Sequence, residues 1–214
     1  MIIRNNLEDD VYEAILEKLL RGYYKPGSRI DVNLLKEELG VSATPVLNAL
    51  KRLVFSGLLE TTPRNTGYYM PKYTLEDMEE VCTTIHFMTL AACTKICSME
   101  NVDEIADRLQ LLADKTVLVS KLRNHIDYMQ VDQEFHEEIL HSLGNKRLLK
   151  IYKDLGNQYN CMLQIFLPEQ LRTMSICTPE NHQVYVDAIR SKDMGLLYRM
   201  STQELQNFRN ELND

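Results

Sequence analysis

The sequence predicts a mainly α-helical protein with two parts, a winged helix-turn-helix over residues 1–72 and an all-helical bundle over residues 73–214. Two short amphipathic segments meet through a tight Gly-Val-Ser turn at residues 40–42, which is the pattern of a helix-turn-helix. The pattern then changes to that of a small β-hairpin. From Leu75 onward the apolar residues recur at helical spacing with few breakers, which predicts the all-helical second part.

Three helices are expected in the first part. Apolar residues at i, i+4 and i+8 predict a helix over Leu7–Arg21. A short helix fits Val32–Leu39, with Asp31 as its N-cap, and a third begins after Ser42, which is a good N-cap residue. Glycines end the three helices, at Gly22, Gly40 and Gly57.

A small hairpin, the wing, is expected to follow the third helix. Residues 58–62 and 68–70 have the composition of strands, and the Asn- and Gly-bearing segment 63–67 has that of a turn. Pro71 and Lys72 mark the predicted domain boundary. Three tyrosines are expected to pack under the wing, namely Tyr68, Tyr69 and Tyr73.

Six helices are expected in the second part, separated by short breaks at polar residues, proline or glycine. They are predicted over Leu75–Ser98, Val102–Ser120, Leu122–Leu143, Asn145–Phe166, Thr178–Ser191 and Met194–Leu212. A helical bundle with a polar pocket fits this pattern.

Charge is divided unevenly between the two parts. The chain has 214 residues, 44% of them apolar and 26% charged, which excludes fibrous and disordered classes. Its formal net charge is −7, yet the segment Arg21–Lys72 holds eight basic and four acidic side chains. The second part carries a net charge of −8, so a polyanion such as DNA has to meet the first part.

Cysteine usage and the chain start predict a cytoplasmic protein. No cysteine spacing is that of a CxxC pair or a zinc ribbon, so reduced and buried thiols are expected at Cys82, Cys93, Cys97, Cys161 and Cys177. The first residues lack the pattern of a signal peptide, and no segment approaches the length of a membrane span. No contact with a membrane is therefore expected.

Three blocks of the first part resemble the DNA-binding domain of the GntR family. They are Leu19–Ile30 with its Pro-Gly turn, Leu39–Leu53 with its Gly-Val-Ser turn, and Ser56–Leu59 with the glycine before the wing. The resemblance covers nearly all of residues 7–72. It implies a winged helix whose third helix lies in the major groove of double-stranded DNA and whose wing touches the minor groove or the backbone.

Eight residues are candidate DNA contacts on this resemblance. They are Ser42, Thr44, Pro45, Asn48, Arg52, Arg64, Asn65 and Gly67. The family usually has two arginines, which are strong guanine readers, where this chain has Ala43 and Leu47. We therefore expect an operator that differs from the family's usual one.

The candidates differ in chemistry. The amide of Asn48 can read adenine, and Arg64 and Asn65 at the tip of the wing suit a phosphate or minor-groove contact. An alternative stays open, in which Ser42 and Thr44 only cap the helix and Arg52 is a solvated surface charge.

A second candidate site lies in the helical part. Asp132 and His136 stand at i, i+4 and therefore project from one helix face, and a carboxylate with an imidazole can hold a divalent metal if a facing helix adds donors. His182 is such a donor. By themselves these residues also fit a solvated Asp/His pair and a surface histidine.

The order Asp-x-x-Phe-His followed by Glu-Asn-His resembles the FCD effector-binding domain of the FadR-like branch of GntR regulators, in its shorter six-helix form. The resemblance covers about residues 74–212. It implies that Asp132, His136 and His182 bind a metal that holds a carboxylate metabolite, with Glu204 where the family has a third histidine. It also places His86 where an effector-binding arginine often stands.

The resemblance implies one divalent metal ion, such as Zn, Ni, Mn or Mg. A glutamate in place of a histidine favours Mg, Mn or Ca relative to Zn, and an emptied site is the alternative. The resulting hypothesis is a transcriptional regulator, a homodimer on a palindromic operator, that responds to a small carboxylate and is not an enzyme. One alternative is a metabolite sensor that has lost sequence-specific DNA reading. Another is a metal-dependent hydrolase or lyase, although the sequence has no nucleophile motif.

Overall fold

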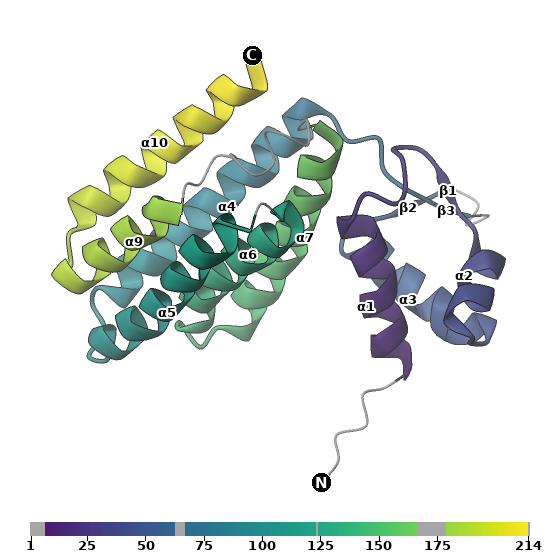
Figure 1. Cartoon of the computed structure of the whole chain (residues 1–214), viewed down its shortest axis with the longest axis horizontal. Helices are drawn as coiled ribbons and strands as arrows, with labels where there is room; N and C mark the ends of the chain where they lie inside the picture. The colour runs from purple at the N-terminus through teal and green to yellow at the C-terminus, as the bar shows by residue number, and fades with distance from the viewer. Residues whose placement is uncertain (1–6, 63–66, 123, 167–178, 214) are drawn as a thin grey trace, which may run out of the picture. The chain divides into compact units, whose positions relative to one another are not determined.

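The computed structural model describes residues 7–62, 67–122, 124–166 and 179–213 (Figure 1). Its residues form two compact units, each described by itself below. The first comprises the residues up to Thr74 together with Asn160–Phe166, and the second comprises Leu75–Tyr159 and the residues from 179 onward. The fold is mainly helical with one small sheet, as the sequence predicts.

The first unit is a helix-turn-helix with a small sheet. Its elements are α1 (Leu7–Leu20), β1 (Arg29–Ile30), α2 (Val32–Leu39), α3 (Ala43–Phe55), β2 (Glu60–Thr61) and β3 (Tyr68–Tyr69). The sheet is antiparallel with the strand order β1-β3-β2, so it has three strands where a two-stranded hairpin was predicted. Strand β1 escaped prediction because two residues are too short for an alternating pattern, and its pairing with β3 is a tertiary contact.

Side chains and glycines set the ends of α2 and α3. Asp31 caps α2 by accepting hydrogen bonds from the backbone N–H groups of Asn33 and Leu34, and Gly40 ends it with a left-handed φ of 65°. Ser42 occupies the N-cap position of α3, but its hydroxyl makes no capping hydrogen bond. The expected cap is therefore right in position and wrong in its hydrogen bond.

The core of the first unit lies between the three helices and the sheet. Helices α1 and α2 both pack against α3, and the contact surface of α3 is apolar. The fully buried residues of this core include Ile15, Leu19, Ile30, Leu35, Val46, Ala49, Leu50, Leu53 and Leu58. Tyr68 and Tyr73 are partly buried against it, in agreement with their predicted packing, whereas Tyr69 is not among the residues packed on this core.

The second unit is all-helical in its described residues. Its helices are α4 (Leu75–Ile96), α5 (Val102–Ser120), α6 (His125–His141), α9 (Pro179–Ser191) and α10 (Met194–Asn213), together with α7 (Lys146–Phe166) as far as Tyr159. Helix α6 begins three residues later than predicted, because the side chain of Asn124 caps it by accepting hydrogen bonds from Ile126 and Asp127. None of the helices in the described parts of the chain is long and apolar enough to cross a membrane.

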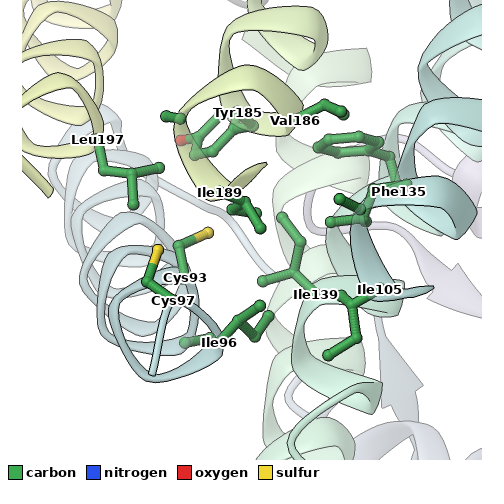
Figure 2. Close-up of a cluster of buried hydrophobic side chains, with 14 of the residues drawn as sticks. Cys93, Ile96, Cys97, Ile105, Phe135, Ile139, Tyr185, Val186, Ile189 and Leu197 are labelled. Atoms are coloured by element: carbon green, nitrogen blue, oxygen red, sulfur yellow. The ribbon is translucent and has the colours of Figure 1, made fainter. Parts of the chain in front are cut away.

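A continuous apolar core joins the helices of the second unit. Helices α6 and α9 pack on α5, and α10 packs on α4 and α9. Figure 2 shows the inward-pointing side chains, with Phe135 from α6 facing Tyr185, Val186 and Ile189 from α9. The predicted reduced and buried thiols are confirmed for the four described cysteines, Cys82, Cys93, Cys97 and Cys161, whereas Cys177 lies outside the described residues.

Candidate functional site

Two helices of the second unit bring three predicted metal ligands together. Helix α6 carries Asp132 and His136 one turn apart, and α9 carries His182. One ligand atom of each residue lies within 4.8 Å of the other two. His182 is fully buried, His136 is 9% exposed, and the side chain of Asp132 is 23% exposed. The two side chains that stand one turn apart on α6 thus lie close to a histidine about fifty residues later in the chain.

Each of the three residues has a buried polar atom without a hydrogen-bond partner among the described residues. These atoms are Oδ1 of Asp132, Nδ1 of His136 and Nε2 of His182. Buried polar atoms are almost always paired in folded proteins, because an unpaired atom loses its bonds to water without compensation. Three such atoms, in residues whose ligand atoms lie within 4.8 Å of one another, fit a cation held between them.

The tautomer of His182 is fixed by its second nitrogen. Nδ1 lies 3.2 Å from the hydroxyl oxygen of Thr116, and that hydroxyl donates its own hydrogen to the backbone carbonyl of Leu112 at 2.9 Å. The hydroxyl therefore accepts, and Nδ1 carries the proton. Nε2 lies 3.2 Å from Asp132 Oδ1, so either a proton on Nε2 or a metal cation has to lie between these two atoms.

Aromatic packing and burial prepare the imidazoles for this role. The ring of Phe135 stacks on His182 with centroids 4.0 Å apart, and it meets His136 edge-on at 5.4 Å. Burial lowers the pKa of His136 to about 4, which keeps this imidazole neutral and able to ligate at neutral pH. Burial by itself raises the pKa of Asp132, but the neighbouring His182 and His136 outweigh it, so the carboxylate is ionised.

Glu204, the fourth predicted ligand, is not among the three converging residues. It is 2% exposed on α10, and its two carboxylate oxygens accept hydrogen bonds from protein groups. The hydroxyl of Tyr185 donates to Oε2 at 2.8 Å, and Nδ2 of Asn181 donates to Oε1 at 3.1 Å. Both carboxylate oxygens thus have protein partners, and the role of Glu204 as a metal ligand stays a prediction.

His86, the predicted effector contact, is the third partner of Glu204. Its Nδ1 donates to the backbone carbonyl of Cys82 at 2.9 Å, and its Nε2 lies 3.5 Å from Glu204 Oε2. Burial lowers the pKa of His86, but the hydrogen bonds to Cys82 and Glu204 outweigh it and raise the pKa to about 10. Burial raises the pKa of Glu204, but the hydrogen bond and the charge of His86 lower it by more, so the pKa lies below its usual value. The two side chains therefore form a buried ion pair.

Three residues of the site carry no sequence signal of their own. Thr116 sits in a helix where its hydroxyl bonds the preceding turn, and Tyr185 and Asn181 lie in α9 like ordinary core and surface residues. Phe135 belongs to the Asp-x-x-Phe-His pattern, but its stacking on His182 becomes visible only in three dimensions.

The candidate DNA contacts lie on α3 and the wing of the first unit. Ser42 and Thr44 are exposed at the start of α3, while Pro45 is buried on its core-facing side. The burial of Pro45 gives it a packing role and does not support a DNA contact, a point that the family motif alone did not show. Arg64 and Asn65 lie outside the described residues.

A hollow lies beside α3. It has a volume of about 470 Å³ and is lined by residues of β1, α2, α3 and the wing, namely Arg29, Ile30, Asp31, Val32, Asn33, Leu47, Gly67 and Tyr68. The predicted contact Gly67 therefore borders it, together with Leu47. Gly67 has little free space, because a Cβ there would lie 3.1 Å from the ring of Tyr69 and 3.3 Å from Nε of Arg29.

The first turn of α1 binds two polar residues of α3. Nδ2 of Asn48 donates to Oε1 of Glu8 at 2.7 Å, and Nη1 of Arg52 donates to Oδ1 of Asp9 at 2.6 Å. The guanidinium of Arg52 also lies over the ring of Tyr12, 4.2 Å from its centroid. These acidic partners come from about forty residues earlier in the chain, and neither contact was predicted from the sequence.

Each part of the chain matches a known family. Residues 7–68 match the family described as bacterial regulatory proteins, gntR family, and residues 86–207 match the FCD domain. The FCD match alone covers more than half of the chain. It contains the three converging residues and both members of the buried ion pair.

Individual relatives are similar at low identity. The chain is 24% identical to the uncharacterized HTH-type transcriptional regulator YdhC of Bacillus subtilis (strain 168), over 67% of this chain and 65% of YdhC, which is just under two thirds of its length. It is 21% identical to the gluconate operon transcriptional repressor of Bacillus licheniformis, over 92% of this chain and 81% of the repressor. The solved structure of E. coli McbR/YncC has the same fold, with a TM-score of 0.77 at 23% identity and 97% coverage of each chain.

Proposed function

The chain belongs to the GntR family of bacterial regulators, with a gntR helix-turn-helix domain followed by an FCD domain, and from this premise we propose that a metal-dependent effector site controls its binding to DNA. It is a DNA-binding transcriptional regulator and not an enzyme, since both domains and the compared relatives are regulators. The proposal concerns the metal, the effector, the assembly and the operator. DNA binding is proposed for residues 1–72, and effector binding is proposed for residues 73–214.

The metal site consists of Asp132, His136 and His182. The observation that supports it most strongly is that ligand atoms of these three residues converge from α6 and α9 and that each residue has a buried, unpartnered donor atom. Two imidazole nitrogens and one carboxylate oxygen are a donor set that Zn, Ni and Mn accept, whereas Mg and Ca prefer oxygen ligands throughout. Because the oxygens of Glu204 are engaged elsewhere, the preference for Mg, Mn or Ca that its glutamate implied is not carried into the proposal.

The effector is proposed to be a small carboxylate metabolite. A bound divalent ion supplies positive charge and open coordination positions, which suit a carboxylate. The side chain of Asp132 keeps a part of its surface exposed, whereas both histidines are buried, so the partly open side of the site lies at Asp132. His86 is proposed to act indirectly, since its nitrogens are engaged by Cys82 and Glu204.

Operator binding is proposed to need a homodimer on a palindromic site. One small helix-turn-helix reads only a few base pairs, and two half-sites about one helical turn apart are needed for useful specificity. Effector binding then favours one dimer geometry over another, by about 1–3 kcal/mol in typical allosteric systems.

Metal titration tests the site directly. Protein freed of metal by a chelator is titrated with Zn, Ni, Mn and Mg, and binding is followed by calorimetry and by the melting temperature. We expect Zn, Ni or Mn to raise the melting temperature. At a metal concentration one hundred times Kd, the added free energy of unfolding is about 2.7 kcal/mol. His182→Ala and Asp132→Ala should remove this gain, and the control His141→Ala, which alters an exposed histidine on α6, should retain it. Equal binding by all four proteins would contradict the proposed ligands.

Selection of genomic DNA tests the regulator. Sheared DNA of the source organism is captured on the purified protein at two salt concentrations, with and without small carboxylates. Enrichment of one palindromic site whose binding weakens steeply with salt is expected, because phosphate contacts release counterions. Absence of any enrichment at low salt would contradict operator reading and favour the alternative of a sensor without sequence-specific DNA binding.

A further inference from the structure

We propose that Glu8 is a positioning residue for DNA reading: it holds the side-chain amide of Asn48 so that the amide presents an acceptor and a donor that match adenine. The inference rests on the proposed operator reading by α3. It adds to that proposal a base preference and the residue that enforces it.

The contact joins two helices that pack against each other. Glu8 lies in the first turn of α1 and Asn48 lies in the middle of α3, and both side chains are half-buried. Their helices pack through the fully buried Ile15, Ala49 and Leu50. The 2.7 Å hydrogen bond from Asn48 Nδ2 to Glu8 Oε1 is therefore anchored at both ends, and hydrogen bonds to a carboxylate are stronger than those between neutral groups.

The carboxylate also decides which way the amide faces. A carboxylate only accepts hydrogen bonds, so it has to meet the nitrogen of the Asn48 amide. Rotating the amide by half a turn would place Oδ1 against Glu8 Oε1, and two acceptors would repel each other. Glu8 thus removes one of the two orientations that a solvated asparagine adopts.

The remaining amide groups form a defined pattern. One N–H of Nδ2 is bonded to Glu8, which leaves Oδ1 as an acceptor and the second N–H as a donor. Adenine offers the complementary pair in the major groove, its N6 amino group and N7, whereas guanine offers two acceptors. An amide with a fixed orientation accepts the first base and rejects the second.

The surrounding part of α3 agrees with this preference. Residues 43–50 contain no lysine or arginine, so no guanidinium from these turns can read guanine. Asn48 is also the one amide in this stretch. Its neighbour Leu47 borders the hollow beside α3, where an apolar side chain suits the methyl group of a thymine.

A matched control is available in the same turn of α1. Asp10 is exposed, and within the described residues it has no hydrogen bond or ion pair. Glu8→Ala and Asp10→Ala remove the same charge from nearly the same place. Any general gain in DNA affinity from losing a negative charge therefore appears in both variants, whereas a loss of amide orientation appears only in the first.

The experiment measures base preference, which a merely structural role of Glu8 would not change at one position. Full-length wild type, Asn48→Ala, Glu8→Ala, Glu8→Gln and Asp10→Ala are titrated with the selected operator and with duplexes in which each A·T pair of a half-site is changed to G·C. We expect one position at which wild type discriminates by about fivefold or more, and at which Asn48→Ala shows no discrimination. Glu8→Ala should lose most of the preference at that position only, Glu8→Gln should recover part of it, and Asp10→Ala should retain it.

The outcomes separate the two proposals. A wild type that selects no sequence would overturn operator reading, and this inference with it. A wild type that discriminates while Asn48→Ala keeps the same preference at every position would overturn the inference alone. The same holds if Glu8→Ala, shown by its melting temperature to be folded, keeps the ratio at the position that Asn48 reads.

Discussion

The hydroxyl of Tyr185 donates a 2.8 Å hydrogen bond to Oε2 of Glu204, deep in the core of the FCD domain. This contact gives the carboxylate a partner within its own fold, and Glu204 is not one of the three residues whose ligand atoms converge. Asn181 and His86 complete the arrangement. A buried carboxylate requires such partners, because it loses far more hydration on burial than a neutral group does.

Removing that hydroxyl should weaken the fold. We expect Tyr185→Phe to lower the free energy of unfolding by about 1.5–3 kcal/mol, the usual range for a hydrogen bond to a charged group. Urea denaturation of metal-free protein measures this difference. Tyr198→Phe, on an exposed tyrosine of α10, is the control and should change stability by less than about 0.5 kcal/mol. Equal effects of the two variants would show that the bond to Glu204 contributes little.

Glu204→Gln should separate a metal ligand from a structural carboxylate. The amide retains the shape of the side chain, so we expect the affinity for Zn to fall by no more than about tenfold, as for residues outside the ligand set. His182→Ala should lose far more. Calorimetric titration of both metal-free variants measures the difference. A loss in Glu204→Gln as large as that in His182→Ala would make Glu204 a ligand after all.

Thr116→Val should loosen the metal site without touching a ligand. The variant is isosteric and removes the acceptor that keeps the proton of His182 on Nδ1. We expect about a 10- to 100-fold loss of metal affinity, which is typical when the second nitrogen of a ligating histidine loses its partner. Thr202→Val, at an exposed threonine that bonds the preceding turn of α10 in the same way, should bind metal like wild type. An unchanged affinity in Thr116→Val would refute the assigned tautomer.

The buried ion pair predicts a pH dependence with a definite sign. His86 has its pKa raised from 6.5 to about 10, so between these values the native state holds a proton that the unfolded state has lost. The free energy of unfolding should therefore fall as the pH rises above about 6.5, by at most about 1.4 kcal/mol per pH unit. Urea denaturation of metal-free protein from pH 6.5 to 9.5 measures the slope. His86→Gln should flatten it, whereas the exposed-site variant His141→Gln should not.

Arg52 should contribute to DNA affinity without selecting sequence. Its guanidinium is exposed and held by Asp9 and Tyr12, which suits a phosphate contact at the edge of α3. Arg52→Ala is expected to weaken binding to all duplexes alike and to reduce the salt slope by about one. Arg190→Ala, which removes an equivalent exposed charge from the FCD domain, should leave the slope unchanged. A loss confined to one sequence would instead make Arg52 a base reader.

The sequence by itself determined the helices and most of their local ends. Apolar spacing fixes the helices because a helix needs an apolar stripe to bury, and Asp31 and Gly40 end α2 through bonds to residues within a few positions. Asp132 and His136 lie on one face of α6 because of the same helical repeat. All of these depend on neighbours in the chain, which a sequence displays directly.

The tertiary structure alone decided which partner each buried polar atom has. The order of motifs predicted Glu204 as a ligand, but its carboxylate is satisfied by Tyr185, Asn181 and His86 from two other helices. The two-residue strand β1 depends on β3 nearly forty residues away, and the orientation of Asn48 depends on Glu8 forty residues earlier. Hydrogen bonds act over about 3 Å in space regardless of separation along the chain, so only the packed fold shows which donors and acceptors meet.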